Sequence, residues 1–413
     1  MPGVQAGAIV LIGVLSLNLG NYVFHTIAAR SLGTALYGDL ATLIAISGLI
    51  ALPLGGVQLW VARYVAHYTT VDDDDAVHWF VRRTMTYAAV IGAIASVALL
   101  AVSWSLRDAL GIASIAAVAI TALTALAATT SSVMWGLAQG VQRFALIAFT
   151  YASTAIARVV LTVIAFGAGL KVGGAMLATL GAMIVALAIP TWVLRRWLRP
   201  AAASGRRVTR FEAGRSLTPV LVGLLAMASL TSLDVVVAKV ALTADEAGIY
   251  GAASLVGRVI LYLPAAIITV LLPRVAARAA DSTETTGILR RSVIVTLGFC
   301  SLSTLVYACA GTQVVEIAFG SEYADAAGLL WLFGIAMTGY ALLNVLLVYD
   351  LGHDRSVVAW LLASGAAAQV ATFLFLHDSM EQIVVVDIGV AVALLAAHEM
   401  ITGGRLIAAI VRA

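Results

Sequence analysis

The chain has 413 residues, of which 62% are hydrophobic and only 11% are charged, and its formal net charge at pH 7 is +3. Soluble globular domains carry about 25% charged residues, so this chain has too few charges to cover a water-exposed surface of its size. The composition therefore excludes a soluble enzyme and a nucleic-acid-binding module, and it indicates an integral membrane protein.

Apolar runs of about 20 residues predict twelve transmembrane helices and an all-α fold. The predicted spans, in chain order, lie near residues 4–26, 37–61, 84–104, 110–134, 144–168, 173–194, 217–240, 250–272, 292–311, 325–349, 356–376 and 382–403. The first run is longer than the apolar core of a signal peptide, so we expect a retained helix. A basic interval divides the chain into a six-helix bundle over 1–194, a linker over 195–215 and a second six-helix bundle over 216–413.

The basic residues predict the orientation of the chain. If loops alternate between the two sides of the membrane, eighteen arginines fall on one side, whereas only Arg30, Arg107, Lys171 and Lys239 fall on the other. Cytoplasmic loops are enriched in arginine and lysine, so both termini and the linker are expected in the cytoplasm.

The two halves share a short pattern. Each contains a span that opens with Tyr-Gly, includes a proline and reaches an arginine ten positions later (Tyr37, Pro53 and Arg63; Tyr250, Pro264 and Arg274). Six spans in each half is an even number, which predicts parallel repeats related by a pseudo-two-fold axis along the membrane normal. Pro53 and Pro264 remove backbone hydrogen bonds within spans, so we expect them to act as hinges.

The sequence has no phosphate-binding glycine loop that ends in Gly-Lys-Ser/Thr, no His-Glu-x-x-His and no paired-cysteine zinc spacing. We therefore expect no enzyme, no catalytic residues and no bound metal or organic cofactor. The acidic run Asp72 to Asp75 is expected to solvate a turn and to cap a helix that begins near Ala76.

Arg158 and Arg258 are predicted to lie inside spans, where a charged side chain is costly and is typical of a functional site. Each lies fourteen positions, or about 21 Å, from the expected cytoplasmic end of its helix, so both are expected at one depth, facing an interior cavity. Two guanidinium groups would suit a phosphate. The alternative is a structural pairing with Asp234 or Asp387.

Other charged residues extend this hypothesis. Arg30 and Lys239, near the outer ends of their spans, could continue a basic lining that binds substrate, although each is equally well explained as an interface anchor. Asp234 and Asp387 are candidates for coupling to an ion, either H⁺ or Na⁺.

Several motifs resemble those of the polysaccharide biosynthesis, or oligosaccharide flippase, family. The first half contains Ala29-Arg30-Ser31-Leu32-Gly33, Tyr37-Gly38 and Val61-Ala62-Arg63-Tyr64. The second half contains Leu233-Asp234, Ala238-Lys239, the run from Ala247 to Ala253, Pro264 and Leu272-Pro273-Arg274. This family belongs to a superfamily that also includes multidrug and toxin extrusion transporters and lipid II flippases.

The resemblance implies a flippase in the bacterial cytoplasmic membrane that moves a polyprenyl-pyrophosphate-linked oligosaccharide to the outer leaflet by alternating access. It also implies a cationic central cavity, to which Arg158 and Arg258 are assigned, and glycan polymerases or glycosyltransferases as partners in the cell envelope. The two additional spans of lipid II flippases are absent. The alternatives are a cation-coupled exporter of drugs or metabolites and a non-transporting membrane subunit of a glycan-assembly complex.

Overall fold

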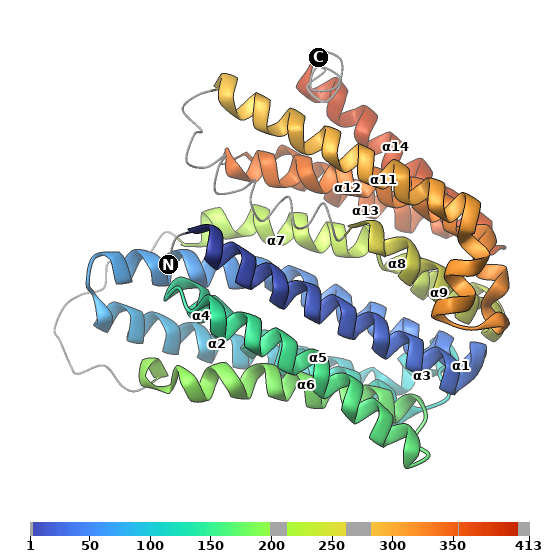
Figure 1. Ribbon diagram of the computed structural model, residues 1–413, viewed down its shortest axis with the longest axis horizontal. Helices are drawn as coiled ribbons and strands as arrows, with labels where there is room; N and C mark the ends of the chain where they lie inside the picture. Colours follow the sequence, from blue (N-terminus) through green and yellow to red (C-terminus); the bar gives the residue numbers. More distant parts are fainter. Residues whose placement is uncertain (1–2, 199–212, 262–281, 354, 404–413) are drawn as a thin grey trace. The chain divides into compact units, whose positions relative to one another are not determined.

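A computed structural model describes residues 3–198, 213–261, 282–353 and 355–403. These residues form helices and short connections, and none of them forms a β-strand (Figure 1). The prediction of an all-α, polytopic membrane protein is confirmed.

The first helix, α1, is the longest of the described helices, and it bends at Gly33. Gly33 has φ +71°, a left-handed conformation that other residues adopt only with strain, so two helical segments meet there. The elements are α1 (Gly3–Thr70), α2 (Asp74–Ala101), α3 (Ser103–Leu110), α4 (Ile115–Gly140), α5 (Phe144–Gly167), α6 (Val172–Val193) and the 3₁₀ turn η1 (Arg195–Leu198).

The second half is also helical wherever it is described. Its elements are α7 (Ala213–Leu230), α8 (Leu233–Ala241), α9 (Ala244–Arg258), η2 (Val259–Leu261), α11 (Ser282–Ala318), η3 (Ser321–Ala326), α12 (Ala327–Gly352), α13 (Val357–Phe373) and α14 (Met380–Thr402). Pro264 and Arg274 lie outside the described residues, and so does the middle of the predicted linker.

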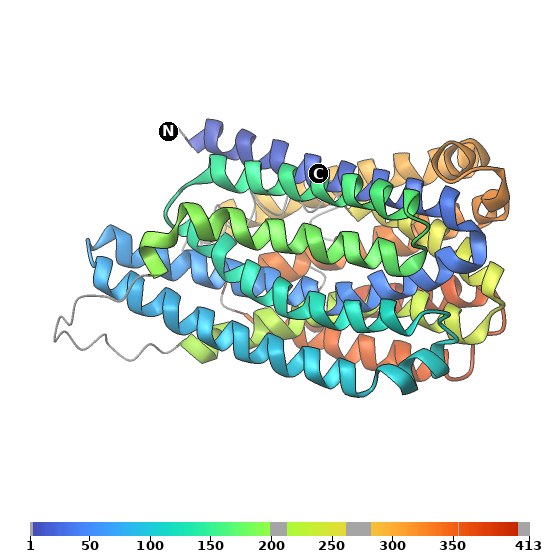
Figure 2. The same ribbon diagram turned by 90° about the horizontal axis from the view of Figure 1, so that it is seen from below.

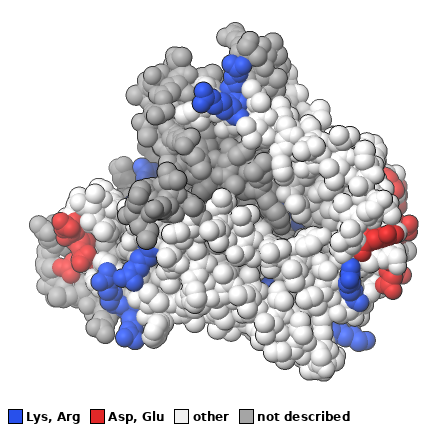
Figure 3. Space-filling view, in the orientation of Figure 1, with Lys and Arg blue, Asp and Glu red and all other residues white. Residues whose placement is uncertain are grey.

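Nine stretches of the described residues are long and apolar enough to cross a membrane, and α13 is a shorter apolar helix. The first stretch, Ile9–Thr70, joins two predicted spans across the Gly33 bend. Large apolar side chains such as Ile91, Ile94 and Val97 are exposed along α2. On the face of the first half in Figure 3, charged side chains gather toward the helix ends and leave an uncharged zone between them. These features are typical of a multi-pass protein surrounded by lipid.

The chain forms two compact units, which we call unit 1 (Met1–Leu32 and Ile50–Leu217) and unit 2 (Gly33–Leu49 and Thr218–Ala413). In unit 1, α4 packs against α2 and α6, and α5 packs against α6; these helices run alongside one another in both views (Figures 1 and 2). The segment 33–49 of α1, expected from sequence in the first bundle, belongs to unit 2.

The segment 33–49 crosses α9 at very short range. A side chain at Gly248 would overlap the backbone of Thr34, and a Cβ at Gly38 would lie 3.0 Å from the Gly248 nitrogen. Thr34 also donates a hydrogen bond to Asp245, and Tyr37 packs edge-on against Tyr323. The two backbones approach this closely because both helices carry glycine at the crossing.

Side-chain caps set the start of several helices. Asp73 accepts a hydrogen bond from the Ala76 amide at 3.0 Å, which confirms the cap predicted for the acidic run. At the start of α9, Thr243 and Glu246 form a reciprocal capping box, in which Glu246 accepts from the Thr243 amide at 3.0 Å. These hydrogen bonds hold the pKa of Glu246 below its usual value.

The capping box predicts a pH-dependent stability at the start of α9. Because the folded pKa of Glu246 is lowered from its ordinary value of 4.5, the stabilisation is complete above that value and is lost as the pH falls through the folded pKa. Glu246→Ala is expected to speed hydrogen exchange of the first-turn amides about fivefold at pH 7, equivalent to about 1 kcal/mol of capping. The ratio of Glu246→Ala to wild-type exchange should fall at acid pH, where the protonated wild-type side chain keeps only a neutral acceptor. Glu246→Gln has a neutral acceptor at every pH, so it should exchange faster than wild type at pH 7 and like wild type at acid pH. A constant ratio for Glu246→Ala would contradict the assignment.

Candidate functional site

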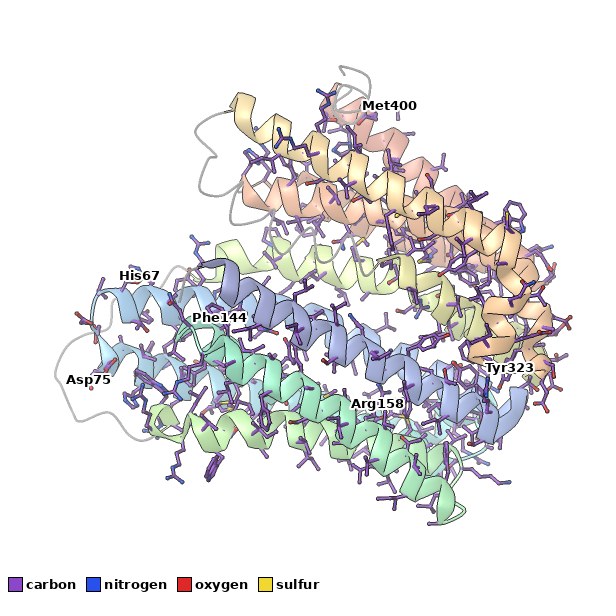
Figure 4. The ribbon with its side chains drawn as sticks, in the orientation of Figure 1. His67, Asp75, Phe144, Arg158, Tyr323 and Met400 are labelled. Atoms are coloured by element: carbon purple, nitrogen blue, oxygen red, sulfur yellow. The ribbon has the colours of Figure 1, made fainter. Side chains whose placement is uncertain are left out.

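Arg158 lies on α5, in unit 1, where α1 packs closely against that helix. Gly13 and Gly20 of α1 meet Ala148 and Ala155 of α5, with no room for a larger side chain. Figure 4 shows Arg158 well along α5 from Phe144, beside α1. The close approach brings two residues of α1 within reach of the guanidinium.

The guanidinium of Arg158 is held by neutral groups. Its Nη1 donates to Asn21 Oδ1 at 2.6 Å, and its Cζ lies 3.7 Å from the centroid of the Phe24 ring. Its Nε is buried and has no hydrogen-bond partner in the described part of the chain. No carboxylate among the described residues forms an ion pair with Arg158. Arg158 is therefore a positioned cation inside a membrane span whose charge the described part of the chain does not neutralise.

Arg258 has a different environment, on α9 in unit 2. Its Nη2 lies 3.0 Å from Asp234 Oδ1, and Asp234 is fully buried, whereas 22% of the Arg258 side chain is exposed. The other carboxylate oxygen of Asp234 accepts hydrogen bonds from Tyr250 at 3.1 Å and Ser254 at 3.2 Å. The spacing of four residues places the three α9 donors on one helix face. The structure thus contains the Arg258 to Asp234 pairing that the sequence left open as an alternative.

Asp387, on α14, is a second fully buried carboxylate in unit 2. Its Oδ1 accepts from Gln369 Nε2 at 2.6 Å, and its Oδ2 is buried and receives no hydrogen bond from any described residue. Gln369 is itself held by the Leu230 carbonyl at 3.0 Å. Asp387 interacts electrostatically with both Asp234 and Arg258. Two buried carboxylates therefore share the charge of one arginine.

The two remaining basic candidates are placed differently. Lys239 Nζ lies 2.6 Å from Asp39 Oδ1, and both side chains are about 95% buried in unit 2. Lys239 is thus held in an internal ion pair that links α8 to the segment 33–49. Arg30 is exposed, in unit 1, near the bend at Gly33. Pro53 lies within α1, where the helix continues through it.

Sequence reasoning missed Asp39, Asn21 and Gln369. Asp39 carried a usable signal, because it is an ionisable residue inside a predicted span. Asn21 and Gln369 are uncharged, and many polar residues in spans only pack against neighbouring helices, so no sequence signal distinguished them. Among the described residues, no group of three or more histidine, cysteine, aspartate or glutamate side chains could hold a metal ion.

Comparison with known proteins agrees with this architecture. The family described as polysaccharide biosynthesis protein matches residues 4–277. No curated protein sequence matches the chain. An inward-facing multidrug resistance MATE family transporter of the MOP superfamily is similar in structure, with a TM-score of 0.73 and 16% identity over 98% of both chains.

A MOP superfamily transporter from Pyrococcus furiosus is also similar, with a TM-score of 0.61 and 16% identity over 98% of this chain and 95% of that one. At such low identity, these likenesses show the fold. The family match extends over most of the sequence, and the resemblance noted in the motifs is confirmed. The chain belongs to the polysaccharide biosynthesis protein family and has the fold of the MOP superfamily transporters.

Proposed function

We propose that the protein is a flippase, which moves a polyprenyl-pyrophosphate-linked oligosaccharide from the cytoplasmic to the outer leaflet of the bacterial cytoplasmic membrane. In this proposal both termini are cytoplasmic, the mechanism is alternating access, and glycosyltransferases or a glycan polymerase act before or after transport. The family description supports a saccharide-linked cargo. The observation that carries the proposal is the uncompensated charge of Arg158.

Arg158 suits a pyrophosphate for a physical reason. A guanidinium stays charged and offers donors that match the geometry of phosphate oxygens. Among the described residues, Nη1 of Arg158 donates a hydrogen bond to Asn21 and its other nitrogens donate none, while the Phe24 ring lies against the planar group. An anionic cargo would supply the negative charge that the described residues of unit 1 do not place beside Arg158.

We also propose that Arg258, in unit 2, binds an anionic group, in a different way from Arg158. Its exposed part can contact a pyrophosphate while its other side remains on Asp234. An anion bound to Arg258 would compete with Asp234 and Asp387 for its positive charge, so the two carboxylates would be less well neutralised. Uptake of H⁺ or Na⁺ by the carboxylates would restore the balance, and this would couple transport to an ion gradient.

The variant Arg158→Gln tests the role of this arginine. Removing a charge-assisted hydrogen bond, worth about 1.5–3 kcal/mol, should weaken cargo binding roughly ten- to hundredfold. Cells that carry Arg158→Gln should accumulate lipid-linked oligosaccharide in the inner leaflet. Arg158→Lys should restore transport only in part, because lysine keeps the charge but loses the planar fork.

Arg107 provides a matched control for this experiment. It pairs with Asp108 near the end of α3, outside the candidate site, so Arg107→Gln should transport normally. Protein abundance must be equal in all strains. Normal transport by a well-expressed Arg158→Gln protein would exclude the proposed role of Arg158.

A cation-coupled exporter is the second candidate. It is favoured by the buried carboxylates Asp234 and Asp387, since such groups attract cationic drugs, and by structural similarity to a multidrug resistance transporter. The two functions differ in one test. An exporter would confer resistance to cationic drugs that depends on Asp387, and this resistance would not depend on Arg158.

A further inference from the structure

Unit 1 contains a cluster of two amides and two aromatic rings, which we call the amide-aromatic cluster: Gln58 of α1, Trp135 and Gln139 of α4, and Tyr151 of α5. Gln58 Nε2 donates to Gln139 Oε1 at 3.1 Å and lies 3.5 Å from the Tyr151 hydroxyl oxygen. Trp135 contacts Tyr151 edge-on, with ring centroids 4.9 Å apart. The cluster thus joins three helices, and its two amides lie beside a core that is otherwise rich in aliphatic and aromatic side chains.

Two of the four polar atoms of the two amides make no hydrogen bond with the described residues. An amide side chain offers an oxygen acceptor and an NH₂ donor. Among the described residues, neither Gln58 Oε1 nor Gln139 Nε2 has a protein partner, and both side chains are partly exposed. The Tyr151 oxygen accepts from Gln58, which leaves its hydroxyl proton free to donate. The cluster therefore presents one acceptor and two donors.

Gln369 in unit 2 provides a comparison with a glutamine that is closed to any ligand. It is fully buried, and its Nε2 is committed to Asp387 and the Leu230 carbonyl. Gln369 Oε1 is also without a hydrogen-bond partner among the described residues, but it is buried, whereas Gln58 and Gln139 are partly exposed and can offer their open polar atoms to a ligand. Open amide groups are unfavourable against hydrocarbon, so their accessible side suits a polar ligand.

The unused groups match the chemistry of a sugar. Neighbouring sugar hydroxyls each donate and accept, so an amide oxygen and an amide NH₂ side by side can bind two of them. Aromatic rings carry a negative face, which attracts the weakly positive C–H groups of a sugar ring. None of the ion pairs among the described residues includes a member of the cluster, so the cluster offers no charged group to a free ion.

The cluster also lies in register with Arg158. Tyr151 and Arg158 are seven positions apart on α5, which places them on one helix face about 10.5 Å apart along the axis. This distance is about the length of a sugar ring together with its bonded phosphate. A phosphate at Arg158 would therefore bring the adjoining sugar to the amide-aromatic cluster.

We propose that Gln58, Gln139 and Tyr151 form a saccharide-binding subsite, which recognises the first sugars of the cargo while Arg158 binds its pyrophosphate. This inference rests on the proposed flippase function and adds a second point of recognition to it. The subsite selects carriers that bear a glycan over bare carrier lipid.

Binding measurements on the full chain in lipid nanodiscs test the subsite without sugar-based detergents. The two probes are undecaprenyl pyrophosphate and the same lipid carrying one N-acetylglucosamine. Wild-type protein is expected to bind the sugar-bearing probe about tenfold more tightly than the bare probe, as two added hydrogen bonds suggest. The double variant Gln58→Leu, Gln139→Leu should lose this preference and keep its affinity for the bare probe. Tyr151→Phe, which keeps the ring, should lose only part of the preference.

The controls separate the subsite from the proposed function. Gln313→Leu makes the same chemical change on an exposed face of α11 and should bind like wild type. Arg158→Gln should weaken binding of both probes. Equal wild-type affinity for the two probes, or a preference that survives in the double variant, would exclude the subsite and leave the anion site intact. Failure of both probes to bind would overturn the proposed function together with the subsite.

Discussion

Replacing Gly248 by valine is expected to prevent stable folding of unit 2. A Cβ at this position would lie 2.6 Å from the carbonyl carbon of Thr34 and would overlap its oxygen. The obstacle is backbone on a neighbouring helix, so rotation of a side chain cannot relieve it. We expect a cost of about 3 kcal/mol or more, at the upper end of the range for overpacked cores. The variant should show a lowered thermal midpoint and poor recovery as a monodisperse species.

Gly298 provides the matched control, because a Cβ there meets no atom within 4 Å and the residue lies on an exposed face of α11. Gly298→Val should therefore have a thermal midpoint close to that of the wild type. Asp245 and Lys239 bind the same segment 33–49. Valine at position 248 should therefore also disrupt the hydrogen bond between Thr34 and Asp245 and the ion pair between Asp39 and Lys239. Wild-type stability of Gly248→Val would show that the segment 33–49 does not lie against α9.

The second large effect is expected at Arg258. Replacing it by glutamine leaves the carboxylate of Asp234 fully buried without its counter-charge, and breaking a buried pair in this way costs about 3–5 kcal/mol. Adding Asp234→Asn should recover most of this loss, because the unpaired charge is removed. The test is a double-mutant cycle of thermal stability on the purified protein.

Asp387 offers a specific control for that cycle. It interacts electrostatically with Arg258, but the described contacts give it Gln369 as its hydrogen-bond donor. Asp387→Asn should therefore rescue Arg258→Gln less well than Asp234→Asn does. Equal rescue by both substitutions would indicate that Arg258 neutralises the pair without a specific bond to Asp234.

The sequence predicted the features that depend on local composition. Apolar length and charge identified the spans, and the acidic run near Asp73 identified a helix cap, because both properties depend on neighbouring residues. The first two predicted spans form one long helix that bends at Gly33. A single glycine in a sequence does not show whether a helix bends or ends there. The membership of residues 33–49 in unit 2 depends on contacts with α8 and α9, some 200 positions away.

The site was predicted in part. Arg158 and Arg258 were found because charge in a span is costly, but their sequence surroundings could not show that one is paired with a carboxylate and the other is not. Asp234 and Arg258 are 24 positions apart, and Lys239 and Asp39 are 200 positions apart. The partners of such residues follow from helix packing, which a single sequence does not specify. The amide-aromatic cluster also joins three helices and has no sequence motif.

The most direct measurement of the central claim is flipping by the purified protein in proteoliposomes. The probe is a fluorescent polyprenyl-pyrophosphate-linked saccharide, whose outer-leaflet fraction is read by a membrane-impermeant quencher. We predict that wild-type protein and Arg107→Gln move the probe across the bilayer, whereas Arg158→Gln, folded to the same thermal midpoint, moves it at least tenfold more slowly, as the lost charge-assisted hydrogen bond requires. Equal rates for Arg158→Gln and wild type, or transport of a cationic drug but not of this lipid, would contradict the claim.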